Sequence, residues 1–436
     1  MRSVHSAPSE PLQLSILTQF FPPDYAPTGQ LMAELAQRLS CQGVQVQVFS
    51  GQPGYAYDRS QAPSPPQEVI NGVTVRRTRT VHLWPQRIRG RAVGGVLYCL
   101  RSLIKLVPAA RRGDLLMVTT EPPYLPVLAY LLHLLFRQPY LCVVYDLYPE
   151  VAIALGVVSE KHVLARLWRS LNRLTWCHAK GIVVLSQTMK PHIIAQCPEV
   201  AHKVSVIHNW ADPDLICPRP KAENWFAQEH GLDQVFTILY SGNMGRCHDL
   251  DTILAAALEL RHDPVRFVFV GAGAKCQPSI DWVQAQGLTN CLFLPYQPKK
   301  TLPFSLTACD LSLVSLVEGV EGLVVPSKLY GSLAAGRPVA AICEPHSYLR
   351  SLLQDGGFGQ AFDNGDGVGL AAFIRQLMAN PALAARMGAR GRDYMEQKFT
   401  PDHCARRYFE VVDRCVPSAQ RQPTYLSKPP TVSSRP

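Results

Sequence analysis

The sequence predicts an α/β protein with two doubly wound, Rossmann-like domains, and three observations carry this prediction. Short apolar runs rich in β-branched residues alternate with longer segments whose apolar residues recur at helical spacing. The alternation occurs twice along the 436 residues, and a proline-rich polar stretch separates the two series. Strands that alternate with helices are typical of parallel sheets covered by helices on both faces.

The first series contains seven apolar runs that are predicted to be strands. Between them, residues 30–42 and 92–110 carry the helical periodicity. The runs are residues 12–17, 44–50, 73–78, 114–120, 140–146, 181–186 and 203–209. We therefore expect an N-terminal domain over residues 1–209.

The second series repeats the scheme after a predicted linker over residues 210–232. A C-terminal domain is expected over 233–400, then a helix over 401–416 that crosses back to the first domain. The predicted strands are residues 236–242, 265–273, 291–296, 311–316 and 338–344. Residues 417–436 are rich in proline and serine, which predicts a disordered tail.

Composition excludes several classes of protein. With 47% hydrophobic and 17% charged residues, the chain is not disordered, collagen-like or a coiled coil. The 13 cysteines show no CxxC pair, so we expect neither a disulfide framework nor a zinc site, but free thiols in a reducing cytoplasm. We expect no secretion signal, and no membrane span because the apolar stretch 122–136 is too short and contains three prolines.

Glycine-containing turns follow two of the predicted strands. Thr28-Gly29 precedes a helix and would let backbone amides approach a ligand, or it is a simple strand–helix turn. In the second domain, Gly242, Gly245 and Arg246 follow a strand and precede a helix, which suits a phosphate. Asp249 is expected to cap that helix; metal binding there is the less favoured alternative.

The segment 316–342 is the densest in candidate residues. Glu318 and Glu321 lie in a glycine-rich loop, and Ser327-Lys328 enters the next helix. Such a loop presents carboxylates and backbone amides to sugar hydroxyls, with Lys328 placed to neutralise phosphate. The alternative is a solvated loop before an ordinary helix.

Two carboxylates follow the strand predicted at 140–146. Asp146 ends this otherwise apolar run, and Glu150 follows one helical turn later. A carboxylate at this end of a parallel strand is either a helix cap or a site residue, and the pattern leaves both open.

Taken together, these segments resemble the retaining glycosyltransferases of the GT-B fold, family 4, and most closely the bacterial branch of O-antigen, capsule and colanic-acid-type polysaccharide assembly. Six motifs in family order carry the resemblance. They are residues 20–39, 145–150, 206–212, 240–245, 293–298 and 321–339.

The resemblance implies transfer of a sugar from a nucleotide diphosphate donor to a lipid-linked or oligosaccharide acceptor, with retention and without a metal or other cofactor. It implies catalytic roles for Asp146, Glu321, Lys328 and Arg246. The implied donor-binding residues are Gly242, Asn243, Gly245, Gly322, Leu323, Ser327 and Gly331. Thr28, Gly29 and Glu150 would form an acceptor or phosphate loop in the first domain.

The chain departs from the family pattern at three positions. Gly331 stands where many members have a second glutamate that binds the donor ribose, and Asn243 stands where an arginine is expected. Tyr145 occupies the place of a common histidine beside Asp146. The missing glutamate leaves a non-catalytic scaffold as one alternative, and an epimerase of nucleotide sugars on the same fold is the other.

The positive charge is concentrated in residues 69–113, which contain no aspartate or glutamate. The positive residues there are Arg76, Arg77, Arg79, Arg87, Arg89, Arg91, Arg101, Lys105, Arg111 and Arg112. Within this stretch Leu97, Leu100, Ile104 and Val107 would share one helix face, with Arg101 and Lys105 on another.

This pattern predicts contact with an anionic membrane, at the inner face of the plasma membrane. A solvated face over an ordinary core stripe is the alternative. Nucleic acid is not an expected partner, because only Trp84 and Tyr98 interleave with the basic residues and no known module is present.

Overall fold

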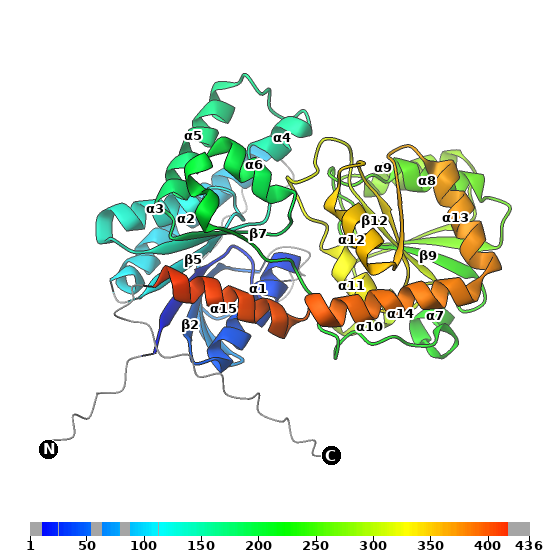
Figure 1. Ribbon diagram of the computed structural model, residues 1–436, viewed down its shortest axis with the longest axis horizontal. Helices are drawn as coiled ribbons and strands as arrows, with labels where there is room; N and C mark the ends of the chain where they lie inside the picture. The colour runs from blue at the N-terminus through cyan, green and yellow to red at the C-terminus, as the bar shows by residue number, and fades with distance from the viewer. Residues whose placement is uncertain (1–10, 25, 54–62, 79–87, 112, 417–436) are drawn as a thin grey trace, which may run out of the picture.

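Two parallel α/β sheets lie side by side in the computed structural model (Figure 1). The structure describes residues 11–24, 26–53, 63–78, 88–111 and 113–416. The predicted fold class is confirmed, since each sheet is wound with helices on both faces.

The first sheet has eight strands in the order β3-β4-β2-β1-β5-β6-β7-β8. Their bounds are β1 Gln13–Leu17, β2 Gln45–Gly51, β3 Gln67–Ile70, β4 Val73–Thr78, β5 Leu115–Thr119, β6 Tyr140–Val144, β7 Gly181–Val184 and β8 Val204–Val206. All neighbours pair in parallel except β3 and β4. The edge strand β3 was not predicted, although Asn71-Gly72 between β3 and β4 has positive φ at both residues, the turn that closes a two-residue hairpin.

Helices cover both faces of this sheet. They are α1 Pro27–Cys41, α2 Ile88–Ala110, α3 Leu125–Phe136, α4 Glu150–Ala154, α5 Val163–His178, α6 Met189–Gln196 and the 3₁₀ helix η1 Pro198–Lys203. Apolar residues of α1 pack on one face of the sheet, and those of α2, α3 and α5 pack on the other. The carboxyl ends of the parallel strands are therefore left open for loops.

The second sheet has six parallel strands in the order β11-β10-β9-β12-β13-β14. Their bounds are β9 Phe236–Ser241, β10 Val265–Val270, β11 Cys291–Leu294, β12 Leu311–Ser315, β13 Val339–Ile342 and β14 Gly359–Phe362. The edge strand β14 was not predicted; it is only four residues long and carries one buried side chain, Phe362. The helices are α8 Asp251–Glu259, α9 Cys276–Ala285, η3 Lys299–Thr301, α10 Leu302–Thr307, α11 Lys328–Ala334, α12 Tyr348–Gly356 and α13 Gly367–Ala379.

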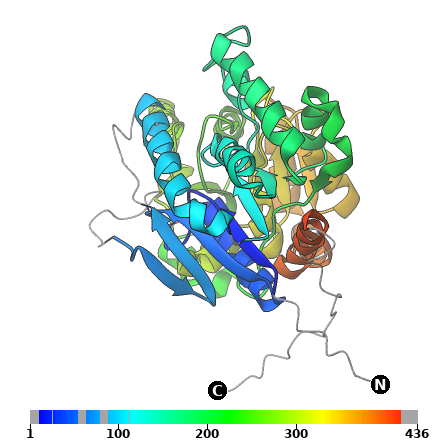
Figure 2. The same ribbon diagram turned by 90° about the vertical axis from the view of Figure 1, so that its left-hand side faces the viewer.

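Two segments connect the domains. The predicted linker, 210–232, contains η2 Lys221–Glu223 and α7 Trp225–Glu229. At the other end of the chain, α14 Pro381–Lys398 runs along the second domain and α15 Pro401–Cys415 continues beside the first (Figure 1, orange and red). Figure 2 shows α15 in red beside the first domain. The buried residues of α15 pack with α1 on the same face of the first sheet.

Within the described ranges, no single helix is long and apolar enough to cross a membrane; one bent pair, Gly367–Ala379 with Pro381–Cys415, passes the same test by length and composition. The tail predicted over 417–436 lies outside the described residues.

Candidate active site

Lys328 places an enclosed ammonium group at the carboxyl end of the second sheet. It is the first residue of α11, and its Nζ lies 3.2 Å from His248 Nε2 and 4.9 Å from the centroid of the Tyr240 ring. In the part of the chain that the structure describes, no carboxylate pairs with it. Burial lowers the pKa of Lys328 to about 7. An enclosed cation without an anion favours a negatively charged ligand.

His248 is held as a neutral acceptor beside this ammonium. Its Nδ1 lies 2.9 Å from the carbonyl oxygen of Ser315, so Nδ1 carries the proton and donates it. Nε2 is then free to accept a hydrogen bond from Lys328. Burial, and then the charge of Lys328, lower the pKa of His248 to about 3, which keeps the imidazole uncharged at neutral pH.

The loops after β9 and β10 touch each other through their backbones above Lys328. Gly242 has φ +126°, and a Cβ there would lie 3.2 Å from Cε of Lys328. Gly271 has φ +137°, and a Cβ there would lie 2.2 Å from the carbonyl oxygen of Gly242. Both positions therefore need glycine, which lets the two loops approach each other and Lys328 closely.

The next residues of the β9 loop point outward. Asn243 and Arg246 are exposed, and the Asn243 carbonyl oxygen accepts a hydrogen bond of 2.9 Å from the Tyr240 hydroxyl. A Cβ on Gly245 would lie 2.9 Å from Nδ2 of the Asn243 side chain. Arg246 forms no ion pair with any described residue, so its guanidinium is available to an anion.

The loop after β12 is one of the places where the two domains touch. Glu321 is buried, and its Oε1 accepts hydrogen bonds from the Thr188 hydroxyl at 2.6 Å and the Tyr348 amide at 3.3 Å. Its Oε2 is buried without a partner among the described atoms. The Leu323 carbonyl oxygen accepts from the Leu147 amide at 2.9 Å. Residues of the predicted donor loop are therefore bonded to the first domain.

Gly322 fits this contact because it has no side chain. Its φ is +74°, and a Cβ there would lie 2.6 Å from Cδ2 of His192 and 2.7 Å from the Thr188 carbonyl oxygen. Any other residue would push the two domains apart at this point.

Two carboxyl groups with raised pKa values, Glu121 and Asp146, follow the neighbouring strands β5 and β6. Burial raises the pKa of Glu121 to about 7, with a further contribution from Asp146, and burial raises the pKa of Asp146 to about 6. The Thr28 side chain acts in the opposite direction and lowers the pKa of Glu121, and Glu121 Oε2 is buried without a partner among the described atoms. Gly29 allows the start of α1 to approach the Phe20 backbone, since a Cβ there would lie 2.9 Å from the Phe20 carbonyl carbon.

Three further predicted residues are Glu150, Ser327 and Gly331. Glu150 forms an ion pair of 2.8 Å with Arg169. Ser327 precedes α11 and its side chain does not cap the helix. A Cβ on Gly331 would lie 3.2 Å from Cδ1 of Leu306, so this face of α11 packs against α10 instead of presenting a carboxylate.

Asp249 acts as a helix cap. Its carboxylate accepts from the Thr252 amide at 3.0 Å and from the Thr252 hydroxyl at 2.7 Å. A hollow of about 560 Å³ nearby is lined by Asp249, Asp251 and Glu318 among others, and its negative charge does not suit a diphosphate.

The sequence missed the groups that complete the site. Glu121 follows the strand 114–120, and its position after a parallel strand was the signal that could have found it. Thr188 and His192 could not be found in this way, because their role depends on contact with the other domain. The arrangement as a whole provides an anion site on the second domain and a carboxyl pair on the first.

Comparison with known proteins assigns the family. Residues 28–210 match the model of the glycosyl transferase 4-like domain, and residues 222–394 match that of the glycosyl transferases group 1. The chain belongs to this family of glycosyltransferases. It is an enzyme of the glycosyltransferase class, EC 2.4, on the GT-B fold.

The glycosyltransferase is similar to two bacterial proteins. The probable glycosyltransferase WbjE of Pseudomonas aeruginosa is 28% identical over 295 residues, which is 67% of this chain and 72% of that protein. WcaI of Escherichia coli (strain K12), named for colanic acid biosynthesis, is 31% identical over 176 residues, or 40% of this chain and 42% of WcaI.

A solved structure has the same fold as the glycosyltransferase. HepE of Anabaena, in complex with UDP and glucose, superposes with a TM-score of 0.69 at 16% identity. The match covers 92% of this chain and 99% of HepE.

Proposed function

We propose that this glycosyltransferase moves a sugar from a nucleotide-diphosphate-sugar donor to a lipid-linked saccharide in cell-surface polysaccharide assembly, with retention of the anomeric configuration. The observation that carries the donor class is Lys328, an enclosed ammonium beside the glycine loops after β9 and β10, with no carboxylate partner among the described residues. The UDP and glucose in the HepE complex and the colanic-acid name of WcaI support the donor class and the pathway class.

In this proposal the donor diphosphate lies between the glycine loops and Lys328. The exposed Arg246 supplies a second cation from the edge of the β9 loop. Negative charge grows on the diphosphate as the bond to the sugar breaks, so a cation fixed beside it stabilises the transition state more than the ground state. The neutral His248 keeps the ammonium directed without adding a competing charge.

The acceptor hydroxyl approaches from the first domain. With pKa values of about 7 and 6, the Glu121 and Asp146 carboxyl groups hold roughly one proton between them at about pH 6.5 and less at higher pH. One group can then donate to a sugar hydroxyl while the other accepts from it. This arrangement suits an uncharged saccharide hydroxyl.

An apolar and basic face of the first domain supports a membrane-bound acceptor. Among the described residues, nine of the fourteen exposed large apolar side chains are on α2, α3 and α5. They are Leu100, Ile104, Leu131, Leu134, Leu135, Val163, Leu164, Leu167 and Leu174. The helices are neighbours, since the Tyr124 and Trp168 rings lie 6.3 Å apart and Arg111 lies 5.3 Å from the Phe136 ring.

The apolar residues predicted to share one face of α2 are not all buried in the structure. Leu100 and Ile104 are 56% and 74% exposed, whereas the core contacts of α2 come from residues such as Tyr98 and Leu106. Leu100 and Ile104 are therefore not a core stripe, which supports their contact with lipid in this proposal. Exposed Arg101 lies on the same helix and suits anionic headgroups, whereas the ammonium of Lys105 donates to the Arg77 carbonyl oxygen.

Part of the predicted positive charge is not on this face. Arg77 is buried and pairs with Glu68 at 2.7 Å. Arg79, Arg87 and Arg112 lie outside the described residues. The side chains of Arg89 and Arg91 also lie outside them.

The test is transfer from labelled UDP-, GDP- and dTDP-sugars into the organic-extractable lipid of the host's own membranes. Label in lipid from one donor supports the proposal. Lys328→Ala should abolish most of this transfer, while Lys300→Ala, at an exposed lysine, should retain it. Conversion of the donor to another nucleotide sugar without acceptor would favour the epimerase. Full activity of Lys328→Ala would overturn the role assigned to the ammonium.

Membrane contact is tested separately with vesicles. The protein should bind anionic vesicles at low salt and leave them at high salt, because the attraction between exposed charges is screened. Equal binding to neutral vesicles would contradict the charge argument.

A further inference from the structure

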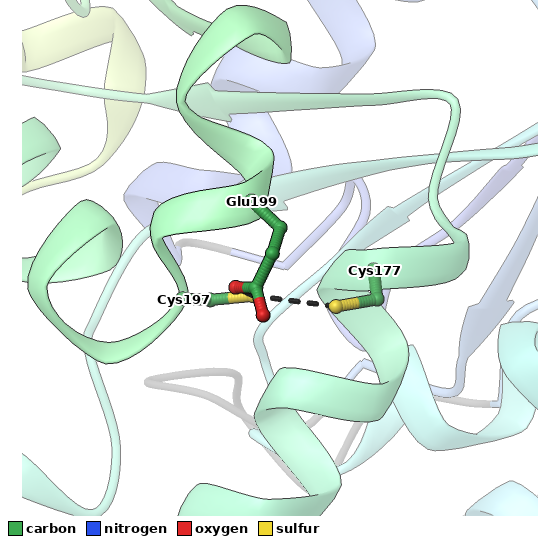
Figure 3. Close-up of side chains that lie close together, drawn as sticks. All are labelled: Cys177, Cys197 and Glu199. Atoms are coloured by element: carbon green, nitrogen blue, oxygen red, sulfur yellow. Dashed lines mark hydrogen bonds between the residues drawn. The ribbon is translucent and has the colours of Figure 1, made fainter.

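Two cysteines and a glutamate meet on the first domain, away from the carboxyl ends of its strands. Cys177 is in the last turn of α5, Cys197 follows α6, and Glu199 is in η1 (Figure 3). The two Sγ atoms lie 3.3 Å apart, and Cys197 Sγ lies 3.4 Å from Glu199 Oε2. One ligand atom from each residue falls within 4.8 Å of the others.

The donor set is the kind that a soft divalent cation prefers. Among the described residues this is the one group of three or more histidine, cysteine or acidic side chains placed closely enough to hold an ion. Tetrahedral Zn²⁺ with Zn–S bonds of about 2.3 Å needs a sulfur–sulfur separation of about 3.8 Å. The observed 3.3 Å therefore requires only a small opening of the pair. Two sulfurs and one carboxylate select Zn²⁺ over Mg²⁺ or Ca²⁺, which prefer oxygen ligands alone.

Two basic side chains near the cluster compensate for the negative charge that its three ligands would carry. Arg173 pairs with Oε1 of Glu199, which leaves Oε2 directed at the sulfurs. Lys203 Nζ donates to the carbonyl oxygens of Cys177 and Ala179, each at 2.8 Å, and so lies beside the sulfurs. Two thiolates and one carboxylate carry three negative charges. One Zn²⁺ together with Arg173 and Lys203 carries four positive charges, so the ligand charge is fully compensated. The end of α5 also favours a cation, since its last carbonyl groups point toward this region.

We propose that Cys177, Cys197 and Glu199 form a zinc site, completed by a water molecule as the fourth ligand. Binding replaces the two thiol protons with the metal and releases them to solvent, with no change of oxidation state. Exposed Cys177 and Glu199 give the ion a path of entry, while buried Cys197 anchors it. The site joins the end of α5 to the segment after α6, so metal binding stabilises the first domain.

Sequence spacing does not reveal this site. The cysteines are 20 residues apart and lack the short CxxC spacing of common zinc motifs, so no zinc site was expected. The fold brings them together because α5 ends and η1 begins at the same edge of the first sheet. The site is independent of the proposed sugar transfer.

The test uses the full chain, freed of metal by a chelator and kept reduced. Titration with Co²⁺ should give thiolate-to-cobalt charge-transfer absorption that saturates at one equivalent and disappears when Zn²⁺ is added. Zn²⁺ should also raise the temperature of thermal unfolding. Cys177→Ser and Cys197→Ser should remove the absorption, whereas Cys41→Ser, at another exposed cysteine, should retain it.

Glu199→Gln provides a variant at an exposed position, in case Cys197→Ser fails to fold. It should retain the absorption but weaken Co²⁺ affinity roughly tenfold or more. Sugar transfer should be unaffected in Cys177→Ser. Absence of the absorption in the reduced wild-type chain would overturn the proposal. Equal absorption in Cys177→Ser, or isolation of the pair as a disulfide under anaerobic conditions, would also overturn it.

Discussion

The lowered pKa of Lys328 predicts that donor binding depends on pH around neutrality. In the free protein the pKa of this lysine is about 7, because burial disfavours its charge. A bound diphosphate favours the protonated form and raises the pKa. Donor binding therefore takes up a proton wherever the free lysine is neutral, and the affinity for the donor falls as the pH rises above about 7.

The magnitude follows from the fraction of protonated lysine. With a pKa of about 7, this fraction falls about tenfold between pH 6 and pH 8. The donor dissociation constant should rise by the same factor, which is about 1.4 kcal/mol. Loss of the ammonium in Lys328→Met should weaken binding about ten- to 150-fold, the equivalent of about 1.5–3 kcal/mol for a hydrogen bond to a charged group.

The carboxyl groups of Glu121 and Asp146 should also make the affinity for the donor fall as the pH rises. The pKa values of Glu121 and Asp146 are about 7 and 6, so both groups lose negative charge as the pH falls through this range. His248, with a pKa of about 3, does not titrate there. Glu121→Gln separates the effect of the carboxyl pair from that of Lys328.

Isothermal titration calorimetry with the intact nucleotide sugar, in buffers of different ionisation enthalpy, measures both affinity and proton uptake. Lys328→Met should flatten the pH profile, and Lys300→Met should leave it unchanged. A wild-type affinity that is constant from pH 6 to pH 8 would refute the reasoning. A wild-type slope that persists in Lys328→Met would assign the titration to another group.

Three further outcomes follow from the domain contact and the membrane face. Gly322→Ala should reduce transfer and lower the unfolding temperature, because its Cβ would lie 2.7 Å from the Thr188 carbonyl oxygen; unchanged values would contradict the tight contact. Thr188→Val should destabilise the fold by about 1–3 kcal/mol in urea unfolding, since the buried Glu321 carboxylate loses its hydroxyl donor. Leu134→Glu should reduce binding to anionic vesicles, whereas Val368→Glu, at an exposed position on the second domain, should not.

The fold was predictable because its signal is local. Apolar runs alternating with helical periodicity locate most strands of both sheets and the helix Pro401–Cys415. The two missed strands, β3 and β14, are edge strands of four residues each. Edge strands are paired on one side only, so they need few apolar residues and leave a weak pattern.

Site residues could be predicted only where residue type and position after a strand, within one segment, indicate their role. Lys328 and Gly242 both come after strands, and a lysine and a glycine both suit a phosphate site. In the structure the Lys328 side chain lies against the backbone of Gly242. Glu150 also follows a strand, yet it forms an ion pair with Arg169. Position after a strand therefore brings a carboxylate near the site but does not decide what it contacts.

The contact between the domains adds a constraint that no single segment contains. Glu321, Gly322 and Leu323 are consecutive residues of the proposed donor loop, and each touches the first domain. One carboxylate oxygen of Glu321 is held by Thr188, while the other is buried without a described partner. A donor sugar that supplies a hydroxyl to this free oxygen would satisfy a buried acceptor, and unsatisfied acceptors are costly. Donor binding and the contact between the domains would thus stabilise each other through the same carboxylate.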